Sequence, residues 1–219
     1  MTINKWKGYP FFNYGKVFSN KELKWVNIFI PRNCSRSFRE CGLFNDEDNK
    51  VPTKPHMWVE DYNKYNKIII IRDPIDRLIS GFYFNYENCV TYKKFDKLKK
   101  EFIGYINPLS MIWNKNREGR FLRNEVSTPQ FGYLELLNID IKDIEVVMLV
   151  ESYTDNFNSF VKKYNLLDLE QLHINKNTSN LKLELKEFIK SDSDLMGDIK
   201  RAYKKDFELY EEAKRLVIK

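Results

Sequence analysis

The chain is poor in the residue types that disulfide scaffolds, zinc sites and membrane spans need. It has three cysteines, Cys34, Cys41 and Cys89, an odd number without metal-ligand spacing, which supports neither a disulfide framework nor a zinc site. No stretch approaches the roughly 18–20 consecutive apolar residues that cross a bilayer, and residues 1–7 contain no apolar signal segment. We therefore expect a soluble, cytoplasmic protein without a membrane partner.

Glycine and proline are also scarce, with eight and seven residues in a chain of 219. The prolines are scattered rather than gathered into a linker, and no internal repeat or low-complexity block is visible. Hydrophobic residues make up 42% of the sequence and aromatic residues 15%, which provides for a sizeable core and excludes a disordered chain. We predict one domain over residues 1–219.

Charge is unevenly distributed along the chain. Lys and Arg number 37 against 31 Asp and Glu, a net charge of +6. Residues 1–123 hold 23 basic and 13 acidic side chains (+10), whereas residues 124–219 hold 14 and 18 (−4). The first part of the chain should therefore attract an anion. Nucleic acid, an anionic cofactor or an acidic polymer would each satisfy this charge.

Three short runs of β-branched, aliphatic and aromatic residues are predicted to be buried strands, at 26–30, 68–71 and 146–150. The second run is apolar on both faces, as in parallel strands that helices cover. Helical apolar spacing follows the second and third runs. This alternation predicts an α/β fold with a central parallel sheet flanked by helices.

The C-terminal residues 181–218 are predicted to be helical, with a break near residues 191–194 and an amphipathic pattern that should cover the sheet. In parallel sheets, ligands bind beyond the carboxyl ends of the strands. We therefore expect the chemistry of this protein in the residues that directly follow Ile30 and Ile71.

The first strand is followed by a polar turn, Pro31-Arg32-Asn33-Cys34-Ser35-Arg36-Ser37, that leads into a helix. Backbone N–H groups at a helix start, with Arg32 and Arg36 beside them, form a site for an anion, and Ser37 adds a hydroxyl donor. The turn has no glycine and lacks the Walker pattern G-x-x-x-x-G-K-[ST]. An Arg-rich turn of this kind is also an ordinary solvated connection.

The second strand is followed by Arg72-Asp73-Pro74-Ile75-Asp76-Arg77-Leu78-Ile79-Ser80-Gly81-Phe82-Tyr83. Asp73 can cap the helix, Pro74 fits its first position, and Asp76 would complete a capping box. Capping does not explain Arg72 at the end of a buried strand, nor Ser80 two turns into the helix. A guanidinium with a nearby hydroxyl is a good receptor for a phosphate monoester.

This second loop, with the pattern Arg-Asp-Pro-x-x-Arg-x-x-Ser-x-x-aromatic, closely resembles the 3′-phosphate motif of sulfotransferases that use 3′-phosphoadenosine 5′-phosphosulfate (PAPS). The first loop resembles their 5′-phosphosulfate loop. The resemblance to the sulfotransferase family 2 group, which includes carbohydrate sulfotransferases, extends from about Val26 to about Tyr210. It also includes Thr128-Pro129-Gln130, Val150-Glu151, the stretch at 173–178 and the stretch at 199–210.

The resemblance implies a P-loop-like three-layer α/β fold and transfer of a sulfuryl group from PAPS to a hydroxyl, of a carbohydrate or another small acceptor, leaving the product PAP. It assigns the 3′-phosphate to Arg72 and Ser80. It assigns the 5′-phosphosulfate to the first loop, that is to Arg32, Asn33, Cys34, Ser35, Arg36 and Ser37. Such transfer requires positioning and charge stabilisation but no metal.

Three residues are candidates for the catalytic groups, namely Arg32, His56 and Glu60. Relatives usually carry lysine where Arg32 stands. Arginine binds the sulfonate but is a poorer proton donor, which affects the rate rather than donor binding. The resemblance implies a base in the segment of His56, whose ordinary pKa of about 6.5 suits that role, with Glu60 as the reserve. The alternative for both His56 and Glu60 is a solvated surface side chain.

Two further residues are predicted to contact ligands on the strength of the resemblance. His173 should contact the cofactor or substrate, and Gln130 should contact the acceptor. Loop packing is the ordinary alternative for both.

Other function classes stay open from the sequence. A P-loop-type kinase would need the Walker lysine and a magnesium carboxylate, which are absent. A non-enzymatic basic module that binds nucleic acid or a nucleotide would use the basic first part, but the net charge is modest and no nucleic-acid motif occurs. A relative that binds the nucleotide without turnover also fits Arg32. We expect no nucleic-acid partner, and the sequence leaves the acceptor and the oligomeric state undetermined.

Overall fold

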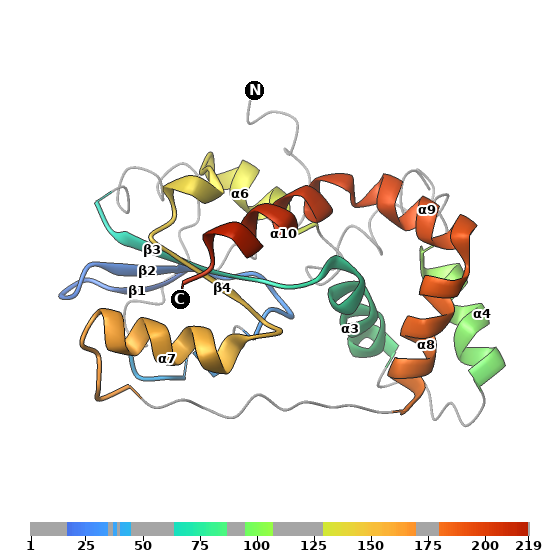
Figure 1. Cartoon of the computed structure of the whole chain (residues 1–219), viewed down its shortest axis with the longest axis horizontal. Helices are drawn as coiled ribbons and strands as arrows, with labels where there is room; N and C mark the ends of the chain where they lie inside the picture. Colours follow the sequence, from blue (N-terminus) through green and yellow to red (C-terminus); the bar gives the residue numbers. More distant parts are fainter. Residues whose placement is uncertain are drawn as a thin grey trace.

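The computed structural model describes residues 17–34, 37–38, 40–44, 64–86, 95–106, 129–169 and 180–218. The elements in this part of the chain (Figure 1) are β1 (Val17–Asn20), β2 (Trp25–Ile28), β3 (Asn66–Ile71), α3 (Pro74–Tyr86), α4 (Phe95–Ile106), α6 (Gln130–Leu137), the 3-10 helix η5 (Ile141–Asp143), β4 (Val146–Leu149), α7 (Tyr153–Lys163), α8 (Asn180–Ser191), α9 (Ser193–Ala202) and α10 (Lys204–Leu216).

The described strands form one sheet in the order β1-β2-β3-β4. The three predicted strands pair in parallel, with Ile28 opposite Ile69 and Ile71 opposite Leu149. The predicted parallel sheet is therefore confirmed. Strand β1, which pairs antiparallel with β2 at the sheet edge, is an addition that the sequence did not predict.

Helices cover both faces of the sheet (Figure 1). On one face, Ile69 packs in a cluster with Leu209 of α10 and with residues of α6. On the other face, Ile70 packs in a cluster with Phe157 of α7. Because successive residues of a strand point to opposite faces, both faces of β3 are buried, and this explains its uninterrupted apolar run. The result is the three-layer α/β fold expected from the sequence.

A third apolar cluster lies beside the sheet, where α3, α4, α8 and α9 pack together (Figure 1). The rings of Phe82 and Phe102 are both fully buried there and meet edge to face, with centroids 5.2 Å apart. The C-terminal helices were expected to cover the sheet, and for α8 and α9 this was wrong. They cover the apolar face of α3, which lies in this third cluster, and only α10 lies on the sheet.

The C-terminal helices are separated at two points. Asp192 caps α9 by accepting a hydrogen bond from the Leu195 N–H at 3.0 Å, which confirms the predicted break. A second break falls at Tyr203, between α9 and α10. After α10 the chain returns to the sheet, where the Ile218 N–H donates to the Val147 carbonyl at 3.1 Å. Within the described ranges, no helix is long and apolar enough to span a membrane.

Candidate functional site

The first predicted anion loop is a tight turn that begins at Pro31, separated by two residues from the end of β2 at Ile28. Arg32 and Cys34 have positive φ angles of 70° and 54°, in the left-handed region that favours glycine. Ser37 and Phe38 are helical, and the Phe38 N–H donates to the Cys34 carbonyl at 3.1 Å. The turn thus leads into a helix as predicted, and it holds two non-glycine residues in conformations that occur preferentially at ligand sites.

Arg72 joins the second loop to the first. It follows β3 directly, and its Nη1 donates to the carbonyl oxygen of Arg32 at 3.1 Å. The Nε of Arg32 in turn donates to the Oγ of Ser80 at 3.0 Å, and Ser80 is buried on α3. The sequence assigned Arg32 and Ser80 to opposite ends of a ligand. Their direct hydrogen bond places both, with Arg72, in one cluster.

Two polar atoms in this cluster are unused. The Nε of Arg72 and the Oδ1 of Asn33 are buried and have no hydrogen-bond partner among the described residues. A buried donor without a partner costs about 1–3 kcal/mol. An anion bound beside Arg72 would satisfy its Nε, and therefore the arrangement suits an anionic ligand.

Asn33 and Gln130 lock the two loops together. The Nδ2 of Asn33 donates to the Ile70 carbonyl at 2.8 Å and to the Oε1 of Gln130 at 2.6 Å. The carboxamide of Gln130 pairs with both backbone polar groups of Arg72, at 3.0 Å to its N–H and 2.8 Å to its carbonyl. Gln130 is fully buried, so its side chain supports the second loop. Its predicted contact with an acceptor stays a prediction.

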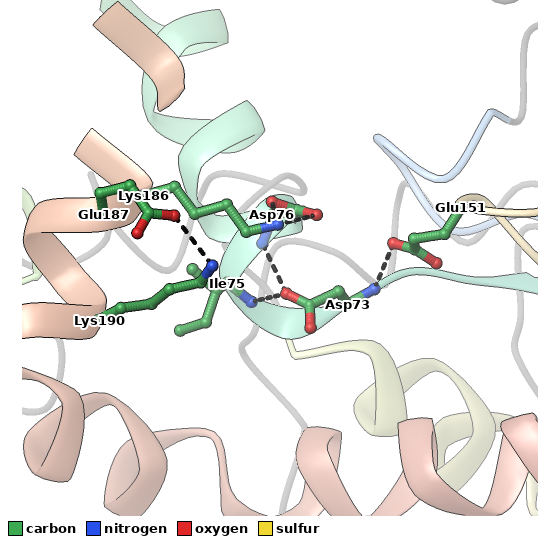
Figure 2. Close-up of polar contacts among 7 residues, drawn as sticks. All are labelled: Asp73, Ile75, Asp76, Glu151, Lys186, Glu187 and Lys190. Carbon is green, nitrogen blue, oxygen red and sulfur yellow. Dashed lines mark hydrogen bonds and ion pairs between the residues drawn. The ribbon is translucent and has the colours of Figure 1, made fainter. Parts of the chain in front are cut away.

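The start of α3 is fixed by three acidic side chains (Figure 2). The Oδ1 of Asp73 accepts from the N–H groups of Ile75 at 2.9 Å and Asp76 at 3.0 Å, which confirms the predicted cap. The capping box was wrong in its second half. The Asp73 N–H donates to Glu151 at 2.9 Å, because this residue after β4 reaches it. Asp76 forms an ion pair with Lys186 of α8 at 2.7 Å.

The ionisation of two groups in the cluster is shifted. Burial raises the pKa of the Cys34 thiol to about 11, although Arg72 and Arg32 lie nearby and oppose the shift. Cys34 is therefore protonated at neutral pH and is not a nucleophile. Burial also raises the pKa of Glu151, against the hydrogen bond from Asp73 and the charge of Arg72. Glu151 thus lies directly beside the arginine cluster.

Several predicted site residues lie outside the described residues, namely Ser35, Arg36, His56, Glu60 and His173. The assignment of the base and of these ligand contacts therefore stays a prediction. In the part of the chain that the structure describes, no group of three or more His, Cys, Asp or Glu side chains could hold a metal ion.

Two buried charged residues at the site were given no role from the sequence, although Arg77 is the second arginine of the Arg-Asp-Pro-x-x-Arg pattern. Arg77 is 2% exposed, and its Nε donates to the Pro31 carbonyl at 3.3 Å. Asp206 is 1% exposed and accepts from the N–H groups at the start of α6. A signal was available for Asp206, because it stands on the buried stripe of α10 with Leu209 and Ala213, at the spacing i, i+3, i+7.

The fold and the site define a class of protein: a P-loop-like α/β protein with two basic loops at the carboxyl ends of neighbouring parallel strands. A comparison with protein families matches residues 5–211 to the sulfotransferase family. The chain belongs to the sulfotransferase family. Membership supports a transferase enzyme and sulfuryl transfer as its general activity. Comparisons with curated proteins and with solved structures gave no match.

Proposed function

We propose that this protein transfers a sulfuryl group from PAPS to a hydroxyl group of a carbohydrate or another small acceptor. Family membership supports the transfer. One observation carries the choice of donor: Arg72 bonds to the backbone of Arg32 while its own Nε is left unpaired. The two basic loops are therefore close enough for one molecule with two anionic groups to contact both.

The residues present fit PAPS, which carries an anionic group at each end of its ribose. Arg72 and Ser80 would hold the 3′-phosphate. The first loop, with Arg32, Asn33, Cys34, Ser35, Arg36 and Ser37, would hold the 5′-phosphosulfate. When bound, PAPS supplies the sulfuryl group. Left-handed residues such as Arg32 and Cys34 occur in turns whose backbone N–H groups bind anions.

In this scheme, the residues of the chain bind and orient the donor. Arg32 keeps its proton at any working pH, so it stabilises negative charge and does not transfer a proton. Its hydrogen bond to Ser80 restricts the guanidinium to one orientation, which lowers the entropic cost of binding. The protonated Cys34 takes no covalent part.

The base that activates the acceptor is proposed to be His56, with Glu60 in reserve and His173 as a contact to donor or acceptor. We propose a cytoplasmic setting, with a glycan or other small acceptor and without a nucleic-acid or membrane partner.

Titration of the protein with PAP tests the donor site. We expect Arg72→Ala to weaken PAP binding by roughly 1.5–3 kcal/mol, the range for hydrogen bonds to a charged group. Arg215→Ala is the matched control, because Arg215 is an exposed arginine on α10 that forms an ion pair with Glu212 of the same helix. Unchanged PAP affinity in Arg72→Ala would remove this residue from the site. Binding of ATP with magnesium in place of PAP would favour a kinase.

A screen of hydroxyl acceptors with labelled PAPS tests the reaction. We expect His56→Ala to bind PAP as the wild type does and to lose transfer, because removal of a base affects only the chemical step. Turnover that survives this substitution would place the base elsewhere, with Glu60→Gln as the next variant.

A further inference from the structure

Asp206 is a buried carboxylate that caps a helix from a different element. It lies on α10, and its two oxygens accept from the backbone N–H groups of Gln130 at 2.8 Å and Phe131 at 2.9 Å. Pro129, at the N-cap position of α6, makes no side-chain cap. The first N–H groups of a buried helix need partners, and Asp206 provides them across 76 residues of sequence.

One residue connects this cap to both loops. The backbone of Gln130 bonds to Asp206, and its side chain bonds to the backbone of Arg72 and to Asn33. Arg72 belongs to the second loop and Asn33 to the first. A displacement of the first turn of α6 would therefore move the supports of both loops together.

A second connection runs through α3. Arg77 donates from its Nε to the Pro31 carbonyl, where the first loop begins. The charge of Arg77 also acts on Asp206 and favours its ionised form. Asp206 thus faces Arg77 from α3 and two amides from α6, and each of these elements contacts the first loop.

Ionisation of the buried Asp206 carboxylate is less favourable than that of an ordinary, solvated capping aspartate. Burial raises the pKa of Asp206 to about 6, with Arg77 and the two amides opposing the shift. Burial therefore disfavours the ionised carboxylate. Asp192 caps α9 with a single hydrogen bond from a partly buried position. A role beyond helix stability would account for the buried carboxylate.

We propose that Asp206 is a positioning residue, which sets the two anion-binding loops relative to each other through Gln130 and Arg77. The inference rests on the proposed function, because it assumes that the two loops bind the two ends of one donor. It predicts that loss of the Asp206 carboxylate weakens donor binding in protein that is still folded.

Asp206→Asn and the control Asp192→Asn test this, with PAP as the probe and urea unfolding measured in parallel. We expect Asp206→Asn to weaken PAP binding by on the order of tenfold or more, the scale that small misplacements of a site produce. Asp192→Asn, which alters a cap remote from the loops, should change PAP affinity by less than about twofold. A variant Asp206→Asn that is less stable but binds PAP as the wild type does would overturn the inference.

Hydrogen exchange of the wild type with and without PAP decides the matter if Asp206→Asn does not fold. Coupling is reciprocal, so PAP should slow exchange at the amides of Gln130 and Phe131 and leave the Leu195 amide of α9 unchanged. If PAP binds but leaves exchange at Gln130 and Phe131 as unchanged as at Leu195, the inference is overturned and the proposed function is not. Absence of PAP binding by the wild type would overturn the proposed function and the inference with it.

Discussion

Single side chains at the site bond mostly to backbone atoms of the loops. Gln130 holds the N–H and carbonyl of Arg72, Arg77 holds the Pro31 carbonyl, and Arg72 holds the Arg32 carbonyl. Such bonds fix the course of a loop that lacks regular structure. Because the loop conformation is set before a ligand arrives, less conformational entropy is lost on binding.

The ionisation of Asp206 makes the free energy of unfolding depend on pH. Comparison of the wild type with Asp206→Asn isolates this dependence. Its folded pKa of about 6 lies above its ordinary value of 3.8. Between these values the folded chain keeps a proton that the unfolded chain has released, so this residue's contribution to stability falls as the pH rises. We expect the free energy of unfolding of the wild type, relative to Asp206→Asn, to fall by about 2 kcal/mol from about pH 4 to pH 6.

Urea unfolding of both proteins across this range measures the difference, which should become constant above about pH 6.5. Arg77 and the amides of Gln130 and Phe131 are the groups that oppose the shift. A difference that rises with pH, or that does not vary, would show that the folded pKa is not raised.

Among the elements, α3 is held in place at its N-terminal end, which lies just after Arg72. Asp73 caps its first turn, Glu151 holds the Asp73 N–H from the end of β4, and Lys186 of α8 binds Asp76 (Figure 2). The helix is therefore tied to the sheet and to the helical cluster at one point. The position of Ser80 on α3, and with it the Ser80 bond to Arg32, depends on this attachment.

We expect Asp73→Ala to lower the free energy of unfolding by about 1–2 kcal/mol, because two N–H groups lose their acceptor. Asp73→Asn should recover most of the loss, since its side-chain oxygen can still accept both bonds. Urea unfolding measures both variants. Equal losses in the two would show that the charge of Asp73, rather than its hydrogen bonds, stabilises the helix start.

Periodic elements could be predicted from the sequence, whereas their partners could not. The strands β2 to β4 and helices α3 and α7 follow from apolar runs and spacing. Strand β1 has no such run, because Val17–Asn20 is a four-residue edge strand of sequence VFSN. An amphipathic pattern shows that a helix buries one face but not what covers it, and for this reason the packing of α8 and α9 was missed.

At the site too, residues that follow a strand locally could be predicted from the sequence, whereas contacts between distant segments could not. Arg72 and Ser80 could be found, because the carboxyl end of a parallel strand and the following helix are local in sequence. The contact of Arg72 with Arg32, and the support from Gln130 and Asp206, join segments 40 to 97 residues apart. No local pattern encodes such contacts.

Over the whole molecule, the sheet with its covering helices and the cluster of α3, α4, α8 and α9 lie side by side (Figure 1). Helix α10 follows α9 from that cluster and packs on the sheet, and Asp206 stands near its start. The loops lie on the sheet side, while much of the apolar burial of α3 and α4 belongs to the cluster. Stability and donor binding should therefore respond differently to substitutions in the cluster.

Phe102 of α4 offers the test, because it is fully buried and packs against Phe82 with ring centroids 5.2 Å apart. We expect Phe102→Ala to lower the free energy of unfolding by about 3–5 kcal/mol through lost burial and a cavity, and Phe102→Leu to lower it less. PAP affinity of the folded fraction should match that of the wild type, in contrast to Asp206→Asn. A parallel loss of PAP affinity in Phe102→Ala would show that the helical cluster, and not only α6 and α10, sets the position of the two loops.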